Sequence, residues 1–200
     1  MPTAAYAPVT LKELSFDVAL HHLDEGAAFV DLRTPDEYLD VHVPGSLDLV
    51  FEFGPGMPSR ARDCIPLSVP LILLEDNTHD LKHVAASLRG KGFSVVGFVR
   101  DGINSWAAAH GRPASTEIDE SLEPPSGLVL DVADPGANAP AGSLRISAEE
   151  LWRRSGELAD ERPVVIAAGY GVRAALAVGI LELAGVREPI FWRTPRRPRG

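Results

Sequence analysis

The chain has 200 residues, of which 45% are hydrophobic and 24% are charged, and its formal net charge is −9. This length allows one large domain or two small ones, and the composition excludes disordered, collagen-like and coiled-coil chains. The excess of acidic side chains argues against a nucleic-acid-binding surface, so no nucleic-acid partner is predicted.

Strand and helix patterns alternate over the first 110 residues. Short apolar runs predict strands, and apolar side chains three and four positions apart predict helices. Strands are expected at 27–32, 47–50, 69–74 and 93–99, and helices at 16–23, 80–89 and 101–110. A further helix is expected after Thr34, because Thr34 at the N-cap, Pro35 and Glu37 form a capping box. The alternation predicts an α/β fold whose parallel sheet is covered by helices on both faces.

Residues 111–126 separate this region from the rest of the chain. The segment contains three prolines and an acidic cluster but no apolar periodicity. A stretch of this kind buries too little apolar surface to fold alone. It predicts a linker at 113–126, between a first unit at 1–112 and a second, shortened unit at 127–200.

The second unit repeats the order of elements found in the first. Strands are expected at 128–132, 144–146, 163–167 and 189–192, and helices at 147–158 and 171–184. Ser147 and Glu150 are placed to form a second capping box. The repeated order predicts an internal duplication.

The chain lacks the usual signals for export or membrane insertion. Its first ten residues have neither the basic nor the apolar region of a signal peptide. The most apolar stretch, 164–186, is interrupted by Arg173 and Glu182, so it predicts a buried core and not a membrane span. The single cysteine, Cys64, excludes a disulfide framework within one chain and is typical of a reducing compartment. A cytoplasmic location without a membrane partner is therefore predicted.

Several motifs of the first unit follow one another in a characteristic order. Residues 30–49 read VDLRTPDEYLDVHVPGSLDL, with Asp-x-Arg after a strand, an acidic-Tyr pair, and His-x-Pro-Gly before the next strand. The residues are Asp31, Arg33, Glu37, Tyr38, His42, Pro44 and Gly45, followed later by Gly92, Phe93, Asp101, Gly102 and Trp106. In these motifs the segment 9–113 resembles the rhodanese homology domain family.

The second unit carries shorter versions of the same motifs. Residues 130–132 are similar to the first motif, 140–143 to the Pro-Gly turn, and 164–175 to the family's active-site strand, loop and helix. The resemblance implies an α/β fold of two rhodanese-like units, each a parallel sheet flanked by helices. The segment 52–66 is also similar to the rhodanese tails of some metallo-β-lactamase-fold enzymes of sulfur metabolism.

The resemblance implies a sulfurtransferase chemistry whose nucleophile is missing here. In the family, a cysteine in the pattern Cys-x-x-Gly-x-Arg takes up a sulfane sulfur on a loop between a strand and a helix. Backbone N–H groups of the loop and the helix N-terminus stabilise the persulfide anion. Alignment on 92–93 places Glu75 at the nucleophile position, Thr78 at the glycine and Asp80 at the arginine. With Asp76, these carboxylates would repel thiosulfate or a persulfide.

In the second unit, Ala168 occupies the nucleophile position. The rest of its loop remains a candidate for binding a small anion, with Gly169, Tyr170, Gly171, Val172 and Arg173 as the residues involved. The alternative is that Gly171 and Arg173 persist only as loop geometry and surface charge.

Cys64 and two histidines are further candidates. Cys64 lies outside the strand-to-helix loop, and Arg60 and Arg62 near it could lower its pKa. The alternative is an ordinary buried thiol. His79 and His83 have the spacing of metal ligands on a helix, but both are expected to face solvent. No metal and no cofactor is predicted.

These residues leave two main functions open. Loss of the nucleophile at Glu75 and Ala168 favours an inactive rhodanese-like protein that serves as a binding, scaffold or regulatory module, with an unidentified protein partner. The alternative is a sulfurtransferase with a thiosulfate or persulfide donor that uses Cys64, brought to the Arg173 loop of its own or a partner chain. A third hypothesis is a carboxylate-based hydrolase or metal site at Glu75, Asp76, His79 and Asp80. The sequence leaves the oligomeric state open.

Overall fold

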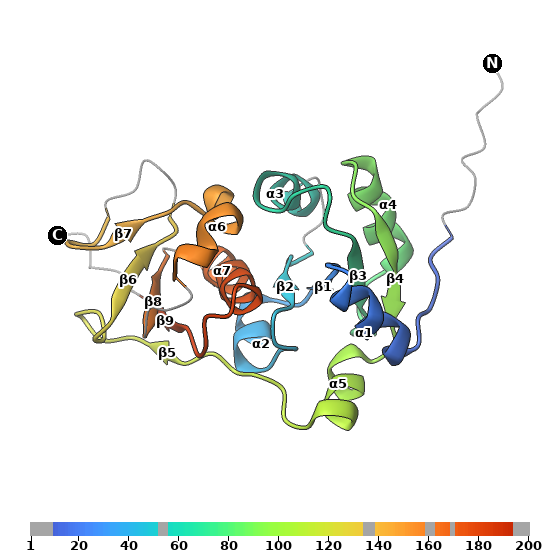
Figure 1. Ribbon diagram of the computed structural model, residues 1–200, viewed down its shortest axis with the longest axis horizontal. Coiled ribbons are helices and arrows are strands. Elements are labelled where there is room, and N and C mark those ends of the chain that lie inside the picture. The colour runs from blue at the N-terminus through green and yellow to red at the C-terminus, as the bar shows by residue number, and fades with distance from the viewer. Residues whose placement is uncertain (1–9, 52–55, 134–138, 159–162, 169–170, 194–200) are drawn as a thin grey trace, which may run out of the picture.

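The computed structural model describes residues 10–51, 56–133, 139–158, 163–168 and 171–193. Two sheets lie side by side along the long axis of the molecule (Figure 1), and the strands of both sheets pair in parallel. The predicted α/β fold with two parallel sheets flanked by helices is confirmed.

The first sheet has the strand order β2-β1-β3-β4. Its strands are Ala28–Asp31 (β1), Leu47–Asp48 (β2), Leu71–Leu74 (β3) and Val95–Val99 (β4). Its helices are Phe16–Asp24 (α1), Pro35–Asp40 (α2), Gly56–Cys64 (α3), Leu81–Gly90 (α4) and Gly102–His110 (α5). Side chains of α1 and α5 pack on the face that carries Phe29 and Ile72, and those of α3 and α4 pack on the face of Val30 and Leu73. Both faces are covered, as predicted.

The second sheet has the strand order β5-β9-β8-β6-β7. Its strands are Ile118–Asp119 (β5), Leu128–Asp131 (β6), Leu144–Arg145 (β7), Val164–Ala167 (β8) and Ile190–Trp192 (β9). Its helical segments are Ala148–Arg154 (α6), the 3-10 turn Ser155–Leu158 and Gly171–Leu183 (α7). Apart from β5, the order repeats that of the first sheet, with β7, β6, β8 and β9 in the places of β2, β1, β3 and β4.

The segment predicted as a linker contains a strand. β5 pairs with Phe191 and Trp192 of β9, and Ala114 exchanges two backbone hydrogen bonds of 2.9 Å with His42. These bonds join residues far apart in the sequence, so no local pattern of apolar residues indicates them. The segment is bonded to both halves of the molecule.

In the described part of the chain, side-chain caps are present at the starts of α1, α2 and α4. Thr34 Oγ1 accepts the N–H of Glu37, and the Glu37 carboxylate accepts the N–H of Thr34 at 3.0 Å, so the first predicted capping box is present. The second is absent, because Ser147 makes no side-chain cap bond although α6 begins directly after it. α3 was not predicted, because Gly56, Pro58 and its polar residues give it no clear helical period.

Helix α7 joins the two halves into one core. Figure 1 shows α7 between the two sheets, where it contacts β2 and α2 of the first half. Its side chains from Ala174 to Leu181 are buried, and one continuous apolar cluster includes Leu47 of β2 and Ile180 of α7. A helix that is apolar on all sides is buried on all sides. None of the helices in the described segments has the length and apolar character needed to cross a membrane.

Candidate functional site

The turn between β3 and α4 lies at the carboxyl end of a central parallel strand, where open α/β sheets bind their ligands. Glu75 is the first residue after β3, and its N–H donates to the carbonyl of Val99 at 2.9 Å. Its carbonyl accepts the N–H of Gly102 at 3.3 Å. A Cβ on Gly102 would lie 2.7 Å from the Leu74 side chain, so only glycine fits at the start of α5. The backbone around position 75 is therefore fixed by two neighbouring elements.

The Glu75 carboxylate is held near a cation. Its Oε2 is buried and lies 3.7 Å from Nη1 of Arg100. The same guanidinium binds Glu13 through two hydrogen bonds of 2.7 and 3.0 Å. Position 75 thus carries a carboxylate that shares one guanidinium with Glu13 and has no sulfur to accept a sulfane atom.

Asp76 organises the rest of the turn. Its Oδ1 accepts the N–H of Thr78 at 2.9 Å, and its Oδ2 lies 2.7 Å from Nδ1 of His79. Burial disfavours the charge of Asp76, but the hydrogen bonds from Thr78 and His79 outweigh it and hold the pKa of Asp76 below its usual value. Asn77, between them, has a positive φ of 63°, which Asn tolerates better than most residues.

Asp80 occupies the N-terminus of α4. Its Oδ1 accepts the N–H groups of Lys82 and His83 at 3.1 and 3.3 Å. These are donors that an anion would use at this helix end. The helix N-terminus is satisfied by the chain's own carboxylate.

A cavity of about 270 Å³ opens beside this turn. It is lined by Leu32, Arg33, Thr34, Glu37, Val50, Phe51, Asp76, Thr78 and His79. The guanidinium of Arg33 has partners outside this cavity, because its Nη2 donates to Asp31 at 2.7 Å and to the carbonyl of Val41 at 2.6 Å. The Asp31–Arg33 pair therefore ties the end of β1 to the end of α2.

The geometry around the two candidate metal ligands differs from the prediction. His79 precedes the N-cap Asp80, so it is not on the helix, and it is half-buried; His83 is exposed in the first turn of α4. Their rings both lie edge-on to Phe51, with centroids 5.6 and 5.9 Å from it. Within the described ranges, no group of three or more His, Cys, Asp or Glu side chains could hold a metal ion.

The loop of the second half follows β8 directly. Ala168 is buried, and Gly169 and Tyr170 lie outside the described residues. Gly171 begins α7 against α2, since a Cβ on it would lie 3.2 Å from Pro35. Val172, in the same turn, is half-buried. This end of α7 thus lies against the first half.

Arg173 already has an anionic partner. Its two terminal nitrogens donate to the two carboxylate oxygens of Glu149 on α6, at 2.9 and 3.3 Å. Burial of Glu149 is outweighed by the hydrogen bond and charge of Arg173, which hold the pKa of Glu149 below its usual value. A small anion at this loop would compete with a bidentate carboxylate.

Cys64 lies at the end of α3 and is 4% exposed. Burial, and next the charge of Glu149, raise the pKa of Cys64 to about 12, although Arg173 and Arg60 act in the opposite direction. Arg60 acts in the expected direction, but burial has the larger effect, so Cys64 agrees with the alternative of an ordinary buried thiol. α3, which carries Cys64, packs against α6 (Figure 1), and α6 carries Glu149, the partner of Arg173.

Asp48 is a buried acid that sequence reasoning missed. It is opposite Asp31 in the register of β1 and β2, is completely buried, and neither of its carboxylate oxygens has a hydrogen-bond partner. Burial, and next the charge of Asp31, raise its pKa well above the usual value, against the influence of Arg60 and Arg33. The only signal in the sequence was an acidic residue inside the short apolar run 47–50.

One family model matches the first half of the chain. Residues 15–109 match the family described as Rhodanese-like domain. The thiosulfate sulfurtransferase of Pseudomonas aeruginosa is 16% identical over 91% of this chain, with a TM-score of 0.42, and the chain spans only 43% of that enzyme's length. The structure of SseA from Escherichia coli, described with the 3-mercaptopyruvate sulfotransferases, is 15% identical over 92% of this chain and 98% of its own, with a TM-score of 0.42. A comparison with curated proteins found no match.

Proposed function

We propose that this protein is a tandem rhodanese-like binding module without persulfide chemistry, acting as a scaffold or regulatory component near sulfur metabolism. The two units are 1–112 and 127–200, and 113–126 connects them. The repeated strand order supports the tandem arrangement. So do Asp31 and Asp131, which end β1 and β6 and accept the N–H two residues on at 3.1 and 3.0 Å.

One observation carries the proposal: neither strand-to-helix loop has a thiol. Glu75, held beside Arg100, follows β3, and the buried Ala168 follows β8. Neither side chain can form a covalent bond to a sulfane sulfur. The N-cap Asp80 and the ion pair of Arg173 with Glu149 also use the groups that would attract an anionic donor.

The nature of the partner follows from what the chain lacks. It offers no cofactor motif, and its net charge of −9 disfavours a nucleic acid. A protein partner in a reducing compartment such as the cytoplasm fits the single cysteine. The resemblance of 52–66 to rhodanese tails of metallo-β-lactamase-fold sulfur enzymes supports a place near sulfur metabolism.

A second candidate function, sulfur transfer through Cys64, is favoured by the charge of Arg173, which acts to lower the pKa of Cys64 although burial outweighs it. The only thiol therefore lies near the guanidinium of the second loop. This function requires α3 to expose Cys64, because the buried thiol has a pKa of about 12 and a thiol reacts as its thiolate.

The deciding experiment is sulfane-sulfur transfer to cyanide, from thiosulfate and from glutathione persulfide, by the intact chain and by Cys64→Ser. We expect no turnover above background for either protein. Turnover that Cys64→Ser abolishes would overturn the binding-module proposal and establish the alternative. Turnover that survives the substitution would indicate a contaminating enzyme, since the chain has no other thiol.

A matched variant tests whether the loop after β3 could support sulfur transfer if it carried a thiol. Glu75→Cys places a thiol at the position after β3 and leaves Cys64 in place. Turnover gained only in this variant would show that the loop still has the family's geometry and that the natural chain lacks only the nucleophile. If Glu75→Cys also shows no turnover, the surrounding carboxylates contribute to the absence of sulfurtransferase activity.

A further inference from the structure

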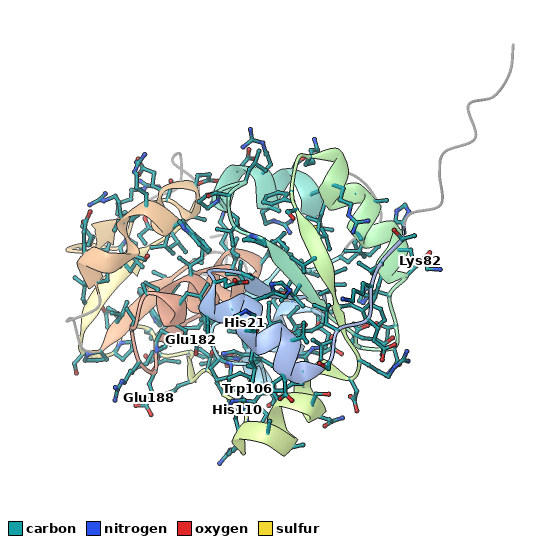
Figure 2. All side chains as sticks on the ribbon, turned by 45° about the vertical axis from the view of Figure 1, so that its right-hand side comes forward. His21, Lys82, Trp106, His110, Glu182 and Glu188 are labelled. Carbon is teal, nitrogen blue, oxygen red and sulfur yellow. The ribbon has the colours of Figure 1, made fainter. Side chains whose placement is uncertain are left out.

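A histidine from the first half is bonded to a glutamate from the second, 140 residues away in sequence. His42 is completely buried two residues after α2. Its Nδ1 lies 2.9 Å from the carbonyl oxygen of Tyr38, and its Nε2 lies 3.1 and 3.2 Å from the two carboxylate oxygens of Glu182. Figure 2 shows Glu182 on α7, near the helices of the first half.

The two hydrogen-bond partners of the imidazole determine which of its ring nitrogens carry a proton. A carbonyl oxygen can only accept, so Nδ1 must donate to Tyr38. A neutral imidazole has a single N–H, and its other nitrogen is then an acceptor. That acceptor would face the Glu182 carboxylate, which itself already accepts the N–H of Gly45 at 2.6 Å. The contact between Nε2 and the carboxylate therefore requires one additional proton.

We propose that His42 and Glu182 retain this proton between them in the folded protein, and that it acts as a pH-sensitive latch between the two halves. With the proton present, the first half is bonded to α7 through His42 and Gly45. Without it, two acceptors face each other in a buried site, which is unfavourable. Loss of the proton at alkaline pH thus loosens α7 from the first half.

Among the described residues, the side chain that stacks on the imidazole does not supply this proton. The Tyr38 ring stacks on the imidazole at 4.3 Å, but its hydroxyl donates to the carbonyl of Ser46 at 2.6 Å. Burial, and next Glu182 and Asp48, raise the pKa of Tyr38 well above 10, so Tyr38 stays neutral. From the 113–126 segment, His42 receives only backbone bonds of Ala114.

Two further charged groups share a hollow with Glu182. Arg187 and Glu188 line a hollow of about 970 Å³ together with Glu182 and Gly45. Glu188 is labelled in Figure 2 beyond the end of α7.

The direction of the response follows from proton linkage. A histidine in water gives up its second proton near pH 6.5, whereas the latch requires that proton. Folding therefore takes up a proton above about pH 6.5, and the folded state weakens as the pH rises. One linked proton changes the folding equilibrium constant by up to tenfold per pH unit.

Glu182→Gln removes the need for the proton. A glutamine can donate its amide N–H to a neutral Nε2 while its oxygen accepts the N–H of Gly45. The experiment is urea unfolding of the full chain between pH 6.5 and 9, for the natural protein and for Glu182→Gln. Other groups that titrate in this range, including five further histidines, are present in both proteins and cancel in the comparison.

We expect the natural protein to lose stability relative to Glu182→Gln as the pH rises, by up to tenfold in the folding equilibrium constant per pH unit. Glu157→Gln is the control, because Glu157 pairs with Arg154 at an exposed site on the second half; its curve should parallel that of the natural protein. Parallel curves for the natural protein and Glu182→Gln would overturn the proposal.

A direct measurement covers the case in which Glu182→Gln fails to fold. In the natural protein labelled with ¹⁵N histidine, we expect two protonated ring nitrogens on His42 at pH 7.5. Assignment by comparison with His42→Gln identifies the signals. A single protonated nitrogen, with the Glu182 carboxyl ionised, would contradict the latch.

Discussion

Gly179 of α7 passes against the backbone carbonyl of Ser46, directly before β2. A Cβ at position 179 would collide with that oxygen and would approach the Tyr38 hydroxyl to 3.0 Å. The glycine is needed for this close approach and not for its backbone angles. The contact sets the distance at which the second half packs on the first.

Gly179→Ala is expected to destabilise the protein by about 1–3 kcal/mol, since overpacking of a tight contact forces the backbone to shift. The loss should appear in urea unfolding of the full chain. Helix propensity alone predicts the opposite sign, because alanine is favoured over glycine in a helix interior. Gly90→Ala in α4 is the control, because nothing lies within 4 Å of a Cβ there, and it should be neutral or stabilising.

Asp48→Asn is expected to stabilise the protein at neutral pH. The pKa of Asp48 is raised in the folded state by burial and then by Asp31, whereas an unfolded aspartate has a pKa of about 3.9. The favourable contribution of Asp48 to the free energy of unfolding is therefore fully present below about pH 4. It is lost as the pH rises through the pKa that Asp48 has in the folded protein. The asparagine stays neutral and avoids this loss.

The measurement for Asp48 is the free energy of unfolding at several pH values from 4 to 8. The advantage of Asp48→Asn should grow with pH. Asp63→Asn changes an exposed aspartate of α3 and should run parallel to the natural protein. A constant difference between Asp48→Asn and the natural protein would show that Asp48 is ionised throughout.

Asp80→Ala should destabilise the protein by about 1 kcal/mol, because it removes the carboxylate that accepts two N–H groups at the start of α4. Thermal unfolding of the variant would measure the effect. Ser147→Ala removes a residue in the same N-cap position of α6 that accepts no helix N–H, so its effect should be smaller than that of Asp80→Ala. Equal effects for the two substitutions would contradict the assigned cap geometry.

Cys64 should react slowly with a disulfide reagent in the native protein. With a pKa of about 12, on the order of one thiol in ten thousand is ionised at pH 8. Labelling should become rapid only when urea unfolds the chain, and its rate in the native protein should continue to rise well above pH 9. Rapid labelling at pH 8 would instead favour the sulfurtransferase alternative.

The sequence predicted local features well and long-range ones poorly. The capping box of Thr34 and Glu37 needs only four consecutive residues, and it is present. For Cys64 the sequence left a lowered pKa and an ordinary buried thiol as alternatives. It could not decide between them, because Arg60 is a neighbour in sequence, whereas the packing of α3 against α6 joins residues far apart in the chain. The bond of His42 to Glu182 joins residues 140 positions apart. No motif indicates a contact of that kind.

The position of α7 has a consequence for the first sheet. β2 is the outermost strand of that sheet, with β1 on one side and α7 packed against it. An outer strand without such a cover presents unpaired backbone groups and invites pairing with another chain. We therefore expect the second half to protect the first from edge-to-edge aggregation, so a fragment ending before residue 127 should be prone to self-association even with its own sheet intact.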